Sequence, residues 1–172
     1  MANKNKALIL LQIIFCICFA ANIPSRPDVR PISTKDIIAV TGTFGEVRSS
    51  GESAKPHIHT GIDWACLADT QVLAPGDGVV VESRYEYGYG NYIKIKHEWI
   101  KDGKPYTVYS IVAHINEFLI LKGAKVKKGQ PIALSGNTGR SVGAHLHYEL
   151  RNEQNAPIWN GTYQAERLAE EK

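Results

Sequence analysis

Short runs in which apolar and polar residues alternate, separated by glycine-containing turns, constrain the fold of this chain most strongly. The sequence has 172 residues and 15 glycines, and the runs Tyr92–His97 and Tyr106–His114 alternate with period 2. That period is typical of β-strands, and the Asp102-Gly103 pair between the two runs is a hairpin signal. We therefore predict an all-β fold, a compact antiparallel β-sheet or sandwich in one domain.

The first twenty residues have the pattern of a secretory signal peptide. Lys4 and Lys6 precede the apolar run Ala7–Ala20, which ends in small residues. We predict that residues 1–20 are removed and that the protein is exported, periplasmic or secreted, without stable membrane insertion after cleavage. The alternative is an uncleaved N-terminal anchor, for which the apolar run is short. Loss of both lysines leaves 18 of the 20 basic residues against 17 acidic ones. This balance gives no reason to expect a nucleic-acid partner.

The rest of the chain divides into three parts. Residues 21–36 are polar and contain prolines, and we interpret them as an extended lead-in. Residues 37–151 form the predicted domain, which we expect to be a monomer, and residues 152–172 form a polar C-terminal tail. Cys66 is the only cysteine after the signal peptide. An internal disulfide is therefore excluded, and we expect Cys66 to behave as a small buried hydrophobe.

Two histidines stand two residues apart in the stretch His145-Leu146-His147. In a strand, both imidazoles point to one face, while Leu146, Tyr148 and Leu150 point to the other. Two neighbouring imidazoles can bind a metal, or one can bind it while the other transfers protons. A pair of ordinary surface histidines on an edge strand would have the same spacing, so the pair alone does not decide.

Further candidate ligands stand at His59 and Asp63, four residues apart with Gly61 between them. The glycine allows the backbone to turn closely. Alone, this spacing is a weak signal. Together with one histidine of the 145–147 pair it offers two nitrogens and one oxygen, a set that suits zinc with water in the fourth position. His114 ends an alternating run, whose parity places it on the face of Val112, and it is a candidate for proton transfer.

Other polar residues are weaker candidates. His57 shares the strand parity of His59 but lacks a correctly spaced carboxylate, so we expect a bystander. His97 closes a lysine-rich run and is expected at the surface. Glu149 shares the face of His147 and is either a partner of that histidine or an ion-pairing residue at the rim.

The ordered motifs resemble those of the M23 peptidases, the lysostaphin-like or LytM-type zinc endopeptidases. The resemblance covers Ile37 to Leu150 and rests on His59-x-x-x-Asp63, Gly88-Tyr89-Gly90-Asn91, Ala113-His114, Val126-x-x-Gly129-Gln130-x-Ile132, Gly136-x-Thr138-Gly139 and His145-Leu146-His147-Tyr148-Glu149. It implies a compact antiparallel β fold of the LytM type, related to barrel-sandwich hybrids. It also implies a site in a groove between loops, and hydrolysis of peptide cross-links between the peptide stems of bacterial peptidoglycan.

Carried over by position, the resemblance implies that His59, Asp63 and His147 bind one Zn²⁺ per chain and that His114 and His145 are catalytic. Zinc would activate a water, His145 would be its base, and His114 would donate to the developing oxyanion. The chain departs from the family pattern at Val112, where the family usually has tyrosine. This difference concerns substrate contacts more than the ligands or the catalytic histidines.

Two other functions compete with this one. A non-catalytic M23-like module would bind peptidoglycan or activate another wall hydrolase, but such a module would be expected to lose ligands that this chain keeps. The stretch Val126–Ile132 also resembles lipoyl- and biotin-carrier domains. A carrier needs a modified lysine at an exposed hairpin tip and a cytosolic or organellar location, and the signal peptide argues against it.

Overall fold

The computed structural model describes residues 27, 29–49, 56–101 and 103–158. The predicted signal peptide and residues 159–172 of the expected tail lie outside this part of the chain. Within it the chain is nearly all β. The elements are η1, a 3-10 helix (Thr34–Asp36), and the strands β1 (Ala39–Gly42), β2 (Val47–Arg48), β3 (His57–Ile58), β4 (Ile62–Ala65), β5 (Gln71–Leu73), β6 (Gly78–Glu86), β7 (Gly90–Lys101), β8 (Lys104–Phe118), β9 (Lys125–Val126), β10 (Pro131–Ser135), β11 (His145–Arg151) and β12 (Pro157–Ile158).

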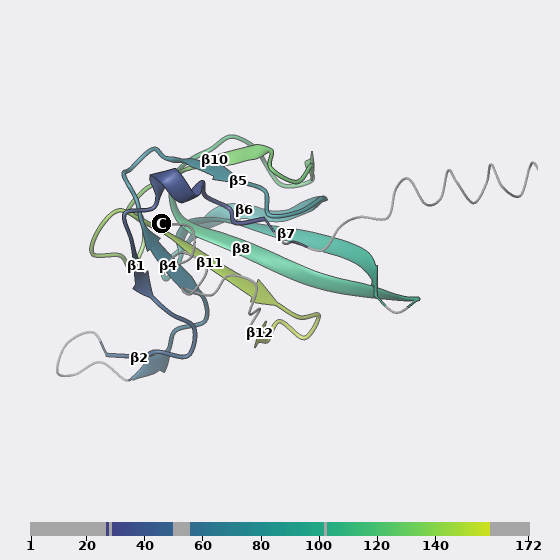
Figure 1. Ribbon diagram of the computed structural model, residues 1–172, viewed down its shortest axis with the longest axis horizontal. Coiled ribbons are helices and arrows are strands. Elements are labelled where there is room, and N and C mark those ends of the chain that lie inside the picture. The colour runs from purple at the N-terminus through teal and green to yellow at the C-terminus, as the bar shows by residue number, and fades with distance from the viewer. Residues whose placement is uncertain (1–26, 28, 50–55, 102, 159–172) are drawn as a thin grey trace, which may run out of the picture.

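The main sheet has the strand order β1-β4-β11-β8-β7-β6-β9. Strand β10 pairs with both β8 and β5, β12 pairs with β11, and β2 and β3 form a separate small sheet. In Figure 1 the long strands β7, β8 and β11 lie side by side, with β5 and β10 on one side of them. Every strand pair in the described residues is antiparallel. The predicted all-β antiparallel fold is confirmed.

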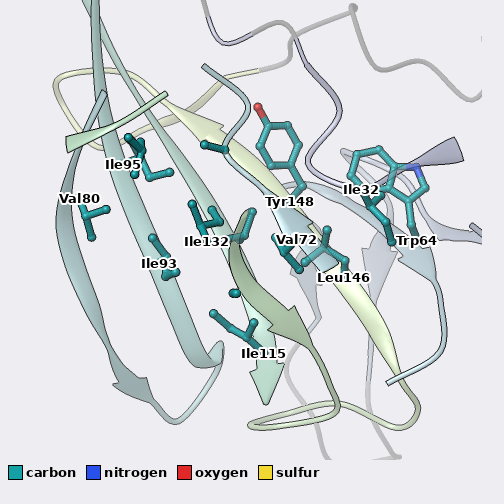
Figure 2. Packing of buried hydrophobic residues seen from close by; sticks show 14 of the residues in the cluster. Ile32, Trp64, Val72, Val80, Ile93, Ile95, Ile115, Ile132, Leu146 and Tyr148 are labelled. Carbon is teal, nitrogen blue, oxygen red and sulfur yellow. The ribbon is translucent and has the colours of Figure 1, made fainter. Parts of the chain in front are cut away.

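One large apolar core lies on one face of the main sheet. Figure 2 shows Leu146 and Tyr148 of β11 pointing into it together with Ile93 of β7 and Ile132 of β10. Leu146, Tyr148 and Leu150 are all buried in this cluster, so the predicted apolar face of β11 is confirmed. Because side chains alternate, His145 and His147 point to the opposite face.

Strand β8 changes its partner at His114. Before this residue β8 pairs with β11 over Tyr109–Ala113, and after it β8 pairs with β10 over Ile115–Phe118. His114 has a φ of 62°, which non-glycine residues seldom adopt, and the register with β7 shifts at the same place. The expectation that His114 shares a face with Val112 is therefore wrong. Val112 lies in the core, whereas the His114 ring lies 4.5 Å from the His145 ring on the other face.

Several smaller features differ from expectation or extend it. His97 was expected at the surface, but it is 0% exposed, because it shares the face of Ile93 and Ile95. In the expected lead-in, Ile32 is buried in the core. Residues 152–158 of the expected tail form a turn and β12, which pairs with β11. Cys66 is buried, as predicted. In the described part of the chain, no helix is long and apolar enough to cross a membrane.

Candidate metal centre

Antiparallel pairing of β4 with β11 places Asp63 directly opposite His147. Residues in this relation point to the same face of a sheet, so register alone brings the two side chains together. His59 reaches them because the chain turns at Gly61. A Cβ on Gly61 would overlap the Tyr148 carbonyl oxygen and lie 2.8 Å from His147 Cε1, so only glycine lets this turn pack so closely on β11. The three predicted ligands are thus brought together, and all are buried.

Three acceptor atoms converge between these side chains. Asp63 Oδ1 lies 2.8 Å from His147 Nδ1 and 3.2 Å from His59 Nε2, and the two nitrogens are 3.1 Å apart. The other nitrogen of each ring faces a group that only accepts: His59 Nδ1 lies 2.9 Å from the Thr43 carbonyl oxygen, and His147 Nε2 lies 3.5 Å from the Glu149 carboxylate. We assign the ring protons to those nitrogens, so in the neutral rings the nitrogens that face Asp63 carry lone pairs.

This donor set fits a zinc ion. Ligand atoms on a tetrahedral zinc ion, bound at ~2.0–2.1 Å, are roughly 3.3 Å apart. The separations here run from 2.8 Å to 3.2 Å. Two imidazole nitrogens and one carboxylate oxygen suit zinc and leave one position for water.

The local electrostatics favour positive charge where the lone pairs converge. Burial opposes ionisation of Asp63, but hydrogen bonds that His147 and His59 donate when their rings are protonated outweigh it and hold the pKa of this carboxyl well below its usual range. Arg48 Nη1 donates to the second Asp63 oxygen at 2.8 Å. Burial also disfavours charge on His147, yet Asp63 and Glu149 together raise its pKa to about 9. A proton or a metal ion satisfies the same demand.

The two histidines predicted to be catalytic lie beside the ligand set. His145 Nε2 is 3.8 Å from Asp63 Oδ1, and the His114 ring lies 5.9 Å from the His147 ring. His145 Nδ1 faces the Gly143 carbonyl oxygen at 2.8 Å, which places the ring proton on Nδ1. The neutral His145 therefore presents the lone pair of Nε2 to the metal centre.

Two segments hold His114 in its unusual conformation. Its backbone N–H donates to the Tyr89 carbonyl oxygen at 2.9 Å, and its Nδ1 lies 2.8 Å from the Thr138 carbonyl oxygen. The segments meet at two glycines, since a Cβ on Gly139 (φ 75°) would overlap the backbone of Gly90. Burial lowers the pKa of His114 to about 4, so the free site favours the neutral ring with Nε2 as acceptor.

Glu149 is a buried partner of His147, which resolves the two alternatives left open by the sequence. Its carboxylate accepts from the Tyr89 hydroxyl at 2.7 Å, from Arg151 Nε at 2.5 Å and from the Thr60 hydroxyl. Burial opposes ionisation of Glu149, but hydrogen bonds from His147, Arg151 and Thr60 outweigh it and lower the pKa to about 2.

Some functional contacts were not predicted from the sequence. Arg48 contacts Asp63 from β2, and no spacing in the sequence links it to the site. Thr60 directly follows His59, and Arg151 stands two residues after Glu149 on β11, so adjacency and period 2 could have indicated both. His57 is exposed and lies outside the ligand set, as expected of a bystander. His97 lies elsewhere, between the Asp77 carbonyl oxygen and Ser110.

Curated relatives share this part of the chain. The peptidoglycan DD-endopeptidase ShyA of Vibrio cholerae serotype O1 is 47% identical over 92 residues, which are 54% of this chain and 20% of ShyA. The DD-carboxypeptidase/endopeptidase Mpg of Neisseria meningitidis serogroup B is 42% identical over 94 residues, which are 55% of this chain and 20% of Mpg. The chain thus spans about a fifth of the length of these relatives.

Solved structures share the fold. A zinc containing peptidase from Vibrio cholerae is 31% identical, with a TM-score of 0.64 over 80% of this chain and 39% of that chain. The catalytic domain of lysostaphin from Staphylococcus simulans is 26% identical, with a TM-score of 0.58 over 79% of this chain and 95% of that chain. Residues 57–158, more than half of the chain, match Peptidase family M23 and contain all the candidate ligands and both further histidines. The chain therefore belongs to Peptidase family M23.

Proposed function

We propose that this protein is a zinc-dependent endopeptidase that hydrolyses peptide cross-links of bacterial peptidoglycan. The observation that carries the proposal is the convergence of Asp63 Oδ1, His59 Nε2 and His147 Nδ1 beside two histidines that are not needed as ligands. A purely structural zinc site would be closed by a fourth protein ligand. Here the described residues offer three ligands, and His145 and His114 lie next to them.

His59, Asp63 and His147 would hold one zinc ion. When bound, zinc would lower the pKa of a water molecule and polarise the scissile carbonyl. His145 would accept the proton of the attacking water at Nε2, the ring nitrogen that its contact with Gly143 leaves free.

His114 would stabilise the oxygen of the scissile carbonyl. Because its Nδ1 proton is held by the Thr138 carbonyl oxygen, His114 can donate from Nε2 only as an imidazolium. Burial disfavours that form in the free site, since it lowers the pKa to about 4. Negative charge developing on the substrate oxygen favours it, so the hydrogen bond strengthens as the reaction proceeds.

The names of the relatives support the choice of substrate. ShyA is named a peptidoglycan DD-endopeptidase and Mpg a DD-carboxypeptidase/endopeptidase. We infer that this chain also acts on the peptide stems and cleaves a D,D bond. Export to the periplasm or outside the cell, after removal of residues 1–20, would bring it to this substrate. We propose that it acts as a monomer without a nucleic-acid partner.

A non-catalytic role in binding peptidoglycan or activating another hydrolase is the second candidate. It is less well supported, because all five histidine and aspartate positions of the family are present and the three ligands meet in space. A carrier function predicts a covalently modified lysine, and mass spectrometry of the purified protein would detect one; we expect none.

Digestion of purified peptidoglycan, with the products identified by mass spectrometry, tests the proposal directly. We expect the wild type to release uncross-linked peptides and to contain one zinc ion per chain. His145→Ala should lower the rate by at least about 10²-fold while keeping the zinc, and His147→Ala should lose both. His57 is exposed, so His57→Ala is the control, and its rate and zinc content should match those of the wild type. Wild-type activity in either site variant would refute the assignments.

A further inference from the structure

We propose that Glu149 is a positioning residue that fixes the orientation of His147 in the ligand set, and that Tyr89, Arg151 and Thr60 hold Glu149 in place for this task. The inference rests on the proposed role of His147 as a metal ligand. It adds a residue that contacts neither metal nor substrate but acts through another side chain.

The buried carboxylate of Glu149 has four polar partners. Its side chain is 0% exposed, and it accepts hydrogen bonds from the Tyr89 hydroxyl at 2.7 Å, from Arg151 Nε at 2.5 Å and from the Thr60 hydroxyl. The fourth contact is His147 Nε2 at 3.5 Å. The three other donors fix the carboxylate from three separate parts of the chain, so the position that it offers to His147 is set before any metal binds.

This carboxylate selects one of two orientations of the His147 ring. An imidazole can turn over and exchange its nitrogen and carbon positions, and either nitrogen can carry the proton. With Glu149 as an acceptor, Nε2 keeps the proton and Nδ1 presents its lone pair 3.1 Å from His59 Nε2. Without the acceptor, neither ring orientation is favoured over the other. Nδ1 then faces His59 less often, and metal affinity falls.

The same network reaches His114, one of the two histidines that we propose to be catalytic. The Tyr89 hydroxyl holds Glu149, while the Tyr89 backbone carbonyl oxygen accepts from the backbone N–H of His114 at 2.9 Å. Arg151 Nη2 also donates to the Tyr89 hydroxyl at 2.9 Å, which closes a ring of contacts around the carboxylate. Tyr89 therefore aligns His114 and, through Glu149, His147.

The chain offers a matched control on the same sheet. Glu82 also accepts from a tyrosine hydroxyl, that of Tyr92, and from an arginine, Arg84 Nε at 2.9 Å. It has the same kind of donors as Glu149 but no contact with a histidine in the described residues, and it is more exposed. Glu82→Gln therefore repeats the chemical change of Glu149→Gln away from the ligand set.

The experiment compares zinc affinity, by competition with a chelator, in the wild type, Glu149→Gln, Tyr89→Phe and Glu82→Gln, together with the visible spectrum of the Co²⁺-substituted proteins. We expect Glu149→Gln to bind zinc about 10–100-fold more weakly and to change the cobalt spectrum. Tyr89→Phe should shift affinity in the same direction by less, and Glu82→Gln should match the wild type.

A merely structural role of Glu149 gives a different result. It would lower the melting temperature of the metal-free protein but leave the zinc affinity and cobalt spectrum of the folded variant unchanged, and this outcome would overturn the proposal. If Glu149→Gln does not fold, an unchanged affinity in Tyr89→Phe would overturn it. His147→Ala tests the ligand role of His147 separately from the positioning role of Glu149. If this variant binds zinc like the wild type, the ligand assignment fails, regardless of the result for Glu149→Gln.

Discussion

His97 makes the stability of this protein sensitive to mild acid. The ring is 0% exposed, with Nδ1 2.8 Å from the Asp77 carbonyl oxygen and Nε2 2.7 Å from Ser110 Oγ. The carbonyl only accepts, so Nδ1 carries the proton of the neutral ring and Nε2 accepts from the serine hydroxyl. Burial lowers the pKa of His97 from 6.5 to about 4, because a second proton would place a charge in the core.

The sign and size of the effect follow from these two pKa values. Between pH 6.5 and about 4 the unfolded chain binds a proton at His97 that the folded protein does not bind. The free energy of unfolding therefore falls as the pH falls through this window, with no contribution from His97 above it. The gap between the two values corresponds to about 3 kcal/mol, a large part of the stability of an ordinary domain.

Urea unfolding of the metal-free protein between pH 7.5 and 4 measures this contribution. Other groups titrate in the same range, so the informative quantity is the difference between the wild type and His97→Gln. The wild type should lose about 3 kcal/mol more than the variant across the window. Ser110→Ala is the control: it removes the hydroxyl partner but keeps the imidazole, and it should retain the steep pH dependence. Parallel curves for the wild type and His97→Gln would refute the reasoning.

Three further changes test the site and its support. Arg48→Gln removes the donor to the outer oxygen of Asp63, and zinc affinity measured against a chelator should fall about 10–100-fold; an unchanged affinity would show that Arg48 does not orient the ligand. Gly61→Ala forces a Cβ against the Tyr148 carbonyl oxygen, so thermal unfolding should show a loss of about 1–3 kcal/mol together with lower zinc content. A wild-type melting temperature would mean that the turn can relax. Leu146→Ala empties a fully buried position behind the site, and urea unfolding should show a loss of about 2–5 kcal/mol, whereas a loss below 1 kcal/mol would contradict tight packing there.

The meeting of His59, Asp63 and His147 in space could be predicted in part from simple periodicity. His145 and His147 share a face through period 2, and Leu146 between them is apolar and buried, as that pattern requires. The order of the motifs then chose His59 and Asp63 as partners. The burial of His97 could also have been predicted, since His97 shares the strand parity of Ile93 and Ile95. The lysines between these residues instead favoured the prediction that His97 lies at the surface.

The face of His114 could not be predicted, because it depends on one residue of irregular backbone. A regular strand would place His114 beside Val112 in the core, and only the left-handed conformation at φ 62° turns it to the other face. Nothing in the local sequence marks this irregularity, since the residue that adopts it is a histidine rather than a glycine. The supporting side chains were missed for different reasons. Arg48 reaches Asp63 from another element, which no spacing in the sequence reveals, whereas Arg151 stands two residues after Glu149 on β11, where period 2 could have indicated it.

The three proposed zinc ligands come from distant parts of the chain. His59 and His147 are 88 residues apart in sequence, and Asp63 and His147 are 84 residues apart. A half-folded chain in which β11 has not yet docked offers no more than two of the three ligands. If these residues bind zinc, the ion should have little influence on how fast the strands first pair and should instead slow the separation of β11 from the folded sheet. Zinc binding would therefore require that β4 and β11 have already paired, and loss of zinc would remove one restraint that holds β11 in place.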